Sequence, residues 1–236
     1  MSNEKCGIIL LHGWANIGNP WQLSAKAFVT SSTFGLGLKN CTIKEPKAPH
    51  RPATAIPLSF TVQAVGITQP RSWFDFKVLP SVAVLSDEGG ESKEDLQEAL
   101  TWVEKEINDL IAEGIQSTKI IIMGFSQGGA LTLYTAVHTK YKLGGFIPFG
   151  AWLPLLKCEP ITALSSPVNK DTPILQLHGL LDTVVMYTPA ATKTKEEMNK
   201  VFTKYKFETI SLATHMTTLA NPLKIAMVRS WLRTIL

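Results

Sequence analysis

Four short apolar runs that end in glycine constrain the fold of this chain more than any other feature. They cover residues 7–11 (closed by His12-Gly13), 120–124, 145–150 and 174–179. Runs without polar alternation are typical of strands buried on both faces of a parallel sheet. Helical patterns at 94–113, 127–139, 189–204 and 222–235 separate or follow these runs, and residues 206–212 form a further, alternating strand. The order predicts right-handed β-α-β units, with a mostly parallel sheet and helices on both faces.

The chain is short enough for a single α/β domain spanning residues 1–236. Its apolar share of 45% and charged share of 18% exclude a disordered or fibrous protein. A proline-rich stretch at about 45–71 interrupts the pattern and is predicted to be a loop insertion, with a short strand at 58–65. A functional loop and an edge decoration without a binding role fit this stretch equally well.

Charge and cysteine content narrow the possible partners and compartments. The net charge is +4, without a basic run interleaved with aromatic residues, so we expect no nucleic-acid partner. Weak attraction to anionic membranes stays open. We find neither a membrane-spanning run nor a signal-peptide pattern and expect a cytoplasmic protein. Cys6, Cys41 and Cys158 have no paired spacing, which predicts reduced thiols and no metal site.

The segment Gly124-Phe125-Ser126-Gln127-Gly128 matches the nucleophile motif G-x-S-x-G. It lies between an apolar strand and a helix, the context in which this motif exposes a serine on a strained turn at the carboxyl edge of a sheet. The neighbouring small residues let strand and helix approach each other. A chance glycine-rich turn is the alternative, and it does not account for this context. We therefore predict that Ser126 is a nucleophile.

A serine nucleophile needs a base and a residue that orients the base. In this type of fold they follow in the order serine, acid, histidine. Asp182 follows the strand at 174–179 on the catalytic edge, whereas Asp171 precedes it. His215 is the only histidine beyond Asp182. The expected triad is Ser126, His215 and Asp182.

The oxyanion formed during attack needs two N–H donors. The backbone N–H of Gln127, directly after the nucleophile, is one, and the loop His12-Gly13-Trp14 offers the Trp14 N–H as the second. The alternative is that His12-Gly13 simply ends a strand. We expect His12 and His178 to be structural hydrogen-bonding residues.

Together with several further segments, these residues resemble the acyl-protein thioesterases and lysophospholipases, the small carboxylesterases of the α/β-hydrolase fold. The matching segments are Leu11-His12-Gly13, Ala48-Pro49, Arg51-Pro52, Ser72-Trp73-Phe74-Asp75, Gly124 to Ala130, Trp152-Leu153-Pro154, Leu177-His178-Gly179, Asp182, Val184-Val185 and His215.

The resemblance implies cleavage of fatty acyl thioesters on protein cysteines, of lysophospholipids and of simple esters, through an acyl-enzyme on Ser126 and without a cofactor or metal. S-acylated proteins or acyl ester lipids would be the substrates, with transient peripheral contact to membranes. The resemblance assigns Trp14 and Gln127 to the oxyanion hole. It places Trp73, Phe74 and Trp152 near the substrate, although core packing is the commoner role of such residues.

Some residues depart from the family pattern. Trp14-Ala15-Asn16 stands where Leu-Gly-Asp is common, Leu180 and Thr183 replace a polar residue and a proline, and Met216 follows His215. Two alternatives therefore stay open. The resemblance implies an apolar acyl channel beside Ser126, and the chain is a short-chain carboxylesterase if Trp14 or the 45–71 stretch narrows that channel. The other alternative is a catalytically weak protein that binds acyl lipids.

Overall fold

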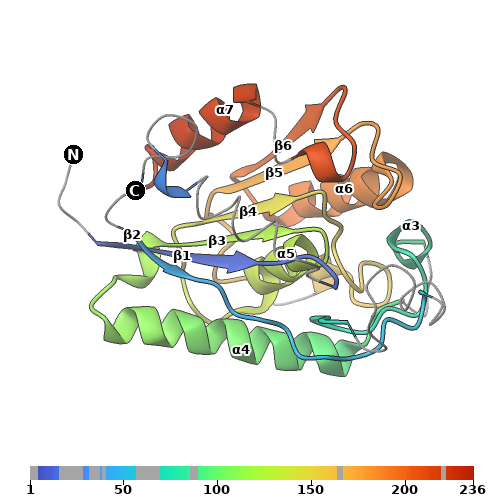
Figure 1. Cartoon of the computed structure of the whole chain (residues 1–236), viewed down its shortest axis with the longest axis horizontal. Helices are drawn as coiled ribbons and strands as arrows, with labels where there is room; N and C mark the ends of the chain where they lie inside the picture. The colour runs from blue at the N-terminus through green and yellow to red at the C-terminus, as the bar shows by residue number, and fades with distance from the viewer. Residues whose placement is uncertain are drawn as a thin grey trace.

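In the part of the chain that the structure describes, six parallel strands form one sheet in the order β2-β1-β3-β4-β5-β6 (Figure 1). The computed structural model describes residues 5–15, 29–31, 38, 41–56, 70–85, 90–163, 167–218 and 222–236. The strands are β1 (Cys6–Leu11), β2 (Cys41–Lys44), β3 (Ile120–Phe125), β4 (Gly145–Phe149), β5 (Ile174–Gly179) and β6 (Tyr205–Ile210). The predicted parallel sheet is thus confirmed.

The four apolar runs form the inner strands of the sheet. Every residue of β1, β3, β4 and β5 is buried, because helices cover both faces. The outer strands β2 and β6 are half-buried along most of their length. Sequence reasoning missed β2, whose four residues Cys-Thr-Ile-Lys are too few and too mixed to form a recognisable pattern.

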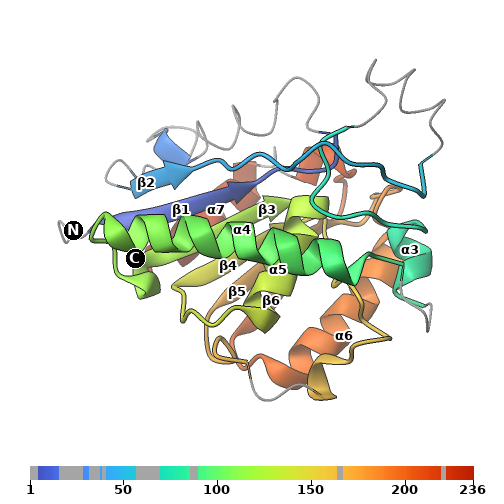
Figure 2. The ribbon, with the colours of Figure 1, turned by 90° about the horizontal axis from the view of Figure 1, so that it is seen from below.

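The described helices pack on both faces of the sheet. They are α3 (Pro80–Ala83), α4 (Lys93–Ala112), α5 (Gln127–His138), α6 (Thr192–Val201) and α7 (Pro222–Leu232), with one-turn elements η1 (Ser117–Lys119), η2 (Ile161–Ala163), η3 (Tyr187–Ala191) and η4 (Met216–Thr218). Apolar residues of α4, α5 and α6 join the core on one face, and Val228 and Leu232 of α7 join the core on the other. Figure 2 shows α4 and α5 on the near side of the sheet and α7 behind it.

Helix α4 begins and ends as its sequence predicts. The Ser92 hydroxyl accepts a hydrogen bond from the Asp95 N–H at 3.2 Å and caps the helix. Gly114 follows its last turn with φ of +84°, a conformation that glycine adopts without steric cost. The inner face buries Leu96, Ala99, Val103, Ile107 and Leu110.

Two predicted helices have different boundaries in the structure. The helix predicted at 189–204 is a turn of π-helix, η3, followed by α6, and it ends before the buried Phe202, where the chain turns toward β6. The helix predicted at 222–235 ends at Leu232.

The strand predicted at 58–65 lies outside the described residues, and a single domain over 1–236 with an insertion at about 45–71 stays a prediction. Among the described helices, none combines the length and apolar character that crossing a bilayer requires.

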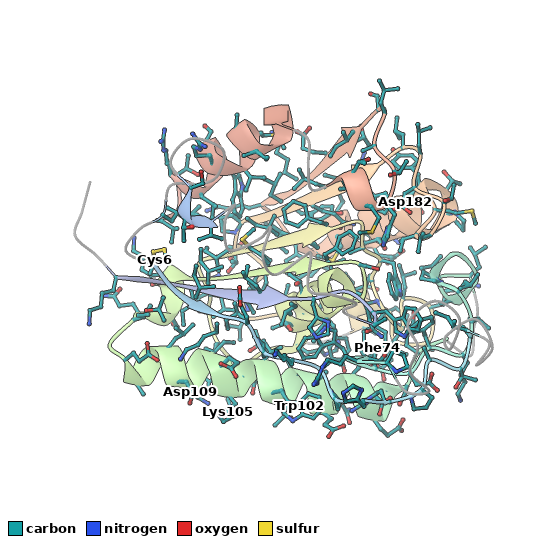
Figure 3. The ribbon with its side chains drawn as sticks, viewed as in Figure 1. Cys6, Phe74, Trp102, Lys105, Asp109 and Asp182 are labelled. Atoms are coloured by element: carbon teal, nitrogen blue, oxygen red, sulfur yellow. A yellow bond between two sulfur atoms is a disulfide. The ribbon has the colours of Figure 1, made fainter. Side chains whose placement is uncertain are left out.

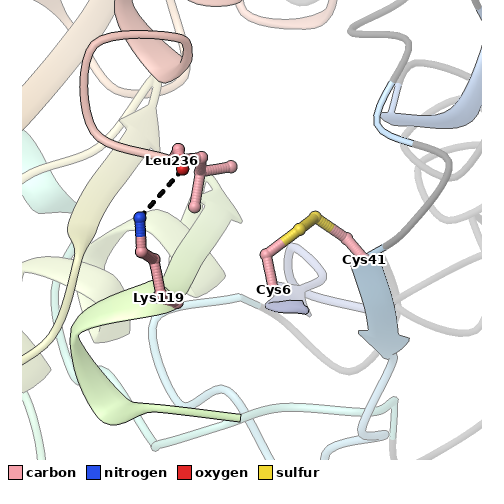
Figure 4. Close-up of a disulfide and its surroundings, with 4 residues drawn as sticks. All are labelled: Cys6, Cys41, Lys119 and Leu236. Carbon is pink, nitrogen blue, oxygen red and sulfur yellow. Dashed lines mark hydrogen bonds between the residues drawn. A yellow bond between two sulfur atoms is a disulfide. The ribbon is translucent and has the colours of Figure 1, made fainter. Parts of the chain in front are cut away.

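The prediction of three reduced thiols is wrong for two of them. Cys6 and Cys41 face each other on β1 and β2 and form a disulfide (Figure 4). Cys158 is free and exposed. The cysteines are 35 positions apart in sequence, and only the pairing of the first residues of the two strands brings their Cα atoms to 4.4 Å. Because β2 was not predicted, neither was the bridge.

The strand order identifies the edge where a site can form. The chain runs from β1 to β2 on one side and from β3 to β4 on the other. The connections that leave β1 and β3 therefore run in opposite directions and open a crevice at the carboxyl ends of these two strands. Figure 3 shows Asp182 and Phe74 on the side to which the strand arrows point, and Cys6 at the opposite side. The disulfide is therefore remote from that crevice.

Candidate active site

Ser126 occupies a strained turn between β3 and α5. Its φ of +54° and ψ of −119° lie in a region that non-glycine residues rarely adopt. The glycines on either side make the turn possible: a Cβ on Gly124 would lie 2.1 Å from the Gly128 carbonyl oxygen, and one on Gly128 would lie 2.2 Å from the Leu11 carbonyl oxygen. The structure thus has the nucleophile geometry that the sequence motif predicts.

His215 and Asp182 meet at the same edge. His215 Nδ1 lies 2.7 Å from Asp182 Oδ2, and both side chains are buried. The other carboxylate oxygen of Asp182 accepts the N–H groups of Val184 and Val185 at 2.9 and 2.8 Å. With both oxygens engaged, Asp182 fixes the orientation of the imidazole and directs its Nε2 away from the carboxylate. Ser126 and His215 line one cavity.

Two neighbours of this pair were not singled out from the sequence. The Phe125 ring packs on the His215 ring with centroids 4.7 Å apart. Gly150, with φ of +52°, follows β4, and a Cβ there would lie 3.3 Å from His215 Nδ1 and 3.5 Å from Asp182 Oδ2. Nothing in the sequence distinguishes Gly150 from the other glycines that end strands.

His12 orients the loop that carries Trp14. Its Nε2 accepts the Ala48 N–H at 3.0 Å, which leaves the proton of the neutral ring on Nδ1. Nδ1 donates to the Gly13 carbonyl oxygen at 2.7 Å. Because C=O and N–H point in opposite directions in a trans peptide, this bond turns the Trp14 N–H away from the His12 ring. Burial lowers the pKa of His12 to about 4, so the ring stays neutral near pH 7.

The side chain of Gln127 ties the start of α5 to the segment Ser72-Trp73-Phe74. Gln127 Nε2 donates to Ser72 Oγ and the Phe74 carbonyl oxygen at 2.8 and 2.7 Å, and its Oε1 accepts the Trp73 N–H at 3.0 Å. The Trp73 indole donates to the His12 carbonyl oxygen at 2.8 Å. One hydrogen-bonded chain therefore connects the loop after β1 with the first residue of α5.

The cavity beside Ser126, here called the site cavity, has a volume of about 200 Å³. Its lining is mostly apolar and consists of Gly13, Trp14, Ile56, Phe76, Leu79, Pro80, Phe125, Ser126, Gln127, Trp152, Val184, Val185, His215 and Met216. A larger and more open cavity of about 720 Å³, lined by charged residues, lacks Ser126 and His215. The smaller cavity is thus the one that contains both predicted catalytic residues Ser126 and His215.

The structure places the three predicted substrate-binding aromatic residues in two different environments. Trp152 lines the site cavity, whereas Trp73 and Phe74 are fully buried and are not among its lining residues. The Trp152 indole donates to the buried carboxylate of Glu91 at 2.7 Å, and the Leu155 N–H donates to the same carboxylate at 3.2 Å. Burial raises the pKa of Glu91. Sequence reasoning missed Glu91, whose carboxylate binds the Trp152 indole and so supports the wall of the cavity.

His178 is a hydrogen-bonding residue of the kind expected at a strand end. Its Nε2 lies 2.8 Å from the Val185 carbonyl oxygen and 3.6 Å from Asp182 Oδ2. Burial lowers the pKa of His178 and favours the neutral ring. The ring therefore supports the turn that carries Asp182, and it is not among the residues that line the cavity with Ser126 and His215. Within the described part of the chain, no three His, Cys, Asp or Glu side chains gather as metal ligands would.

Comparison with known proteins relates this chain to one family. The family model described as phospholipase/carboxylesterase matches residues 2–225. The chain is 30% identical over 184 residues to the "Acyl-protein thioesterase 1 homolog 2" of Dictyostelium discoideum, covering 78% of this chain and 73% of the relative. It is 32% identical to the "Acyl-protein thioesterase 1" of Cryptococcus neoformans, covering 76% of this chain and 67% of the relative.

Solved structures agree in fold. The crystal structure of Arabidopsis thaliana SOBER1 superposes with a TM-score of 0.75 and 25% identity, covering 98% of both chains. The Zea mays acyl-protein thioesterase 2 superposes with a TM-score of 0.72 and 22% identity, covering 99% of this chain and 94% of that one.

Proposed function

Because the chain belongs to the phospholipase/carboxylesterase family of α/β-hydrolases, we propose that it is a serine hydrolase that removes fatty acyl groups from protein cysteines and cleaves related lysophospholipid and carboxylic esters. The observation that carries the proposal is the buried 2.7 Å contact between His215 and Asp182 beside a strained Ser126, in a mostly apolar cavity. Relatives named acyl-protein thioesterase support the thioester as substrate.

In the proposed reaction, Ser126 Oγ attacks the acyl carbonyl carbon while His215 Nε2 takes the hydroxyl proton. Asp182 holds the Nδ1–H and stabilises the imidazolium. The N–H groups of Gln127 and Trp14 stabilise the tetrahedral oxyanion. On collapse, the C–S bond breaks and His215 returns the proton to the leaving thiolate. A water molecule, deprotonated by His215, then attacks the acyl carbon; the bond between that carbon and Ser126 Oγ breaks, His215 returns the proton to Ser126 Oγ, and the fatty acid leaves.

The direct test compares wild type with Ser126→Ala on a chain-length series of acyl thioesters and oxoesters. Ser117→Ala, a half-buried serine at the other end of β3, is the matched control. We expect Ser126→Ala to lower kcat by a factor of 10⁴ or more, on the order of the loss seen when a serine nucleophile is removed, while the control keeps wild-type turnover. Less than about a hundredfold loss would refute the assigned nucleophile.

The size of the site cavity favours the second candidate, a short-chain carboxylesterase. About 200 Å³ is small beside the roughly 300–1,000 Å³ of typical ligand pockets, and Trp14 and Ile56 contribute to its walls. A rate that peaks at long thioesters supports the thioesterase, and a peak at the shortest oxoesters supports the carboxylesterase. Binding of acyl lipids without turnover by wild type would support the catalytically weak binding protein.

For localisation, we propose a cytoplasmic protein with peripheral contact to membranes. The Cys6–Cys41 disulfide weighs against this compartment, because the cytosol keeps most thiols reduced. Fractionation of cells, with the protein detected in the cytosolic, membrane and secreted fractions, tests the assignment. Protein in the cytosolic fraction supports it, whereas protein confined to an oxidising compartment, where disulfides persist, would contradict it.

A further inference from the structure

Two loops at the mouth of the site cavity expose apolar side chains. The first loop, residues 180–188, follows β5, and the second, residues 211–217, follows β6. Leu181 and Val184 are 52% and 56% exposed, and Leu212 and Met216 are 86% and 62% exposed. Leu180 and Met186 are also exposed. We call these six residues the apolar rim.

The rim is continuous with the site cavity. The Leu180 N–H donates to the Ile210 carbonyl oxygen and the Leu181 N–H donates to the Ala213 carbonyl oxygen, both at 3.0 Å, so the two loops lie side by side. Val184 of the first loop and Met216 of the second line the cavity. The triad residues Asp182 and His215 belong to these same loops, and Figure 3 places Asp182 at this end of the molecule. A surface that contacts the rim therefore also contacts the entrance to Ser126.

The exposed part of both loops carries no charge. Asp182 and His215 are their only acidic, basic or histidine side chains, and both are buried against each other. The other exposed residues of the loops are serine and threonine. Attraction of the chain's net charge of +4 to anionic groups therefore does not act through the rim.

We propose that the apolar rim docks on the uncharged apolar layer of a lipid–water interface, so that an acyl chain enters the site cavity directly from lipid. Single exposed apolar residues are normal, but a contiguous group at a cavity mouth marks a binding surface. A second copy docked symmetrically on the rim would cover the cavity mouths of both subunits and block substrate entry. This inference rests on the proposed function for its substrate, and the interface itself is testable without turnover.

The test is flotation of the protein with phosphatidylcholine vesicles at low salt and at about 1 M salt, where charge attraction is screened within about 3 Å. The variant Leu181→Ser/Leu212→Ser changes two exposed rim residues that do not line the cavity. Val168→Ser is the matched control, because Val168 is 48% exposed but precedes β5, at its amino end. Hydrolysis of a soluble acetyl ester and the oligomeric state are measured for each protein.

We expect wild type to bind the neutral vesicles at both salt concentrations. The double variant should bind about tenfold more weakly, because it loses the burial of two leucine side chains, while the control stays within about twofold. Soluble-ester turnover of the double variant should match wild type and demonstrates that it folds. Ser126→Ala should bind vesicles like wild type although it does not hydrolyse the ester.

Three results would overturn the docking surface. They are no binding of wild type to neutral vesicles, equal binding by the double variant, or binding that disappears in high salt. Self-association of wild type that the double variant abolishes would instead assign the rim to a second copy. If soluble-ester turnover persists in any of these cases, the proposed hydrolase activity stands while the docking surface falls. Vesicle binding by wild type without ester turnover would instead support the docking surface and contradict the proposed hydrolase activity.

Discussion

Replacement of Gly150 by alanine tests whether the backbone after β4 sets the geometry of the His215–Asp182 pair. Gly150 has φ of +52°, and its missing Cβ would lie 3.3 Å from His215 Nδ1 and 3.5 Å from Asp182 Oδ2. Gly114, after α4, has φ of +84°, and a Cβ there would meet nothing within 4 Å. The two substitutions therefore share backbone strain and differ in their contact with the triad.

The expected effects follow from these distances. Alanine in the left-handed region costs roughly 1 kcal/mol at either position, equivalent to about 2–4 °C in Tm for a chain of this size. At Gly150 the imidazole must also move by a few tenths of an ångström to relieve the tight contact. Since a misplacement of about 1 Å can lower kcat by about a hundredfold, we expect about a tenfold loss for Gly150→Ala and wild-type kcat for Gly114→Ala.

The assay combines urea unfolding with steady-state hydrolysis of a soluble acetyl ester, which keeps acyl-chain binding out of the comparison. A kcat defect confined to Gly150→Ala, with similar losses of stability in both variants, supports the reasoning. Wild-type kcat in Gly150→Ala would refute it. So would an equal kcat defect in Gly114→Ala, because strain alone would then account for the loss.

Three further predictions concern the triad, the loop after β1 and the disulfide. Asp182→Asn should lower kcat by about 10⁴ without unfolding the protein, because an asparagine no longer selects the Nδ1–H tautomer of His215; steady-state kinetics beside circular dichroism check this. The pKa of His12 is lowered to about 4 by burial, so the unfolded chain binds more protons between about pH 6.5 and 4, and acidification through this window should remove about 3 kcal/mol of stability. Urea unfolding across the window measures the effect, and the loss of stability on acidification should be about 3 kcal/mol smaller in His12→Gln than in wild type. Cys41→Ser opens a loop of 35 positions and should lower the free energy of unfolding by about 4 kcal/mol under oxidising conditions, whereas Cys158→Ser should not; an equal effect of both would contradict the assigned bridge.

Local sequence patterns were sufficient to predict the buried strands, the long helix α4 and the turn that carries Ser126. Neighbouring residues alone predict β3, α5 and the turn at Ser126. Burial on both faces leaves an uninterrupted apolar run in β3, and the strained turn needs small residues on either side of the serine. The chain order of Asp182 and His215 was also sufficient to select them, since each follows a strand at the catalytic edge. The structure brings the two side chains to 2.7 Å from each other, and their catalytic roles stay a prediction.

The remaining features depend on residues that are far apart in the chain and are brought together by packing. The disulfide needs β2 beside β1, and β2 is an edge strand whose four residues carry no clear pattern. Gly150 approaches the triad only because β4 lies between β3 and β5, and Glu91 reaches Trp152 across 61 positions. Likewise, Trp73 is buried whereas Trp152 lines the cavity, and this difference depends on how each ring packs against its neighbours. A sequence pattern records periodicity and order, but such contacts depend on strand pairing and side-chain packing across the whole sheet.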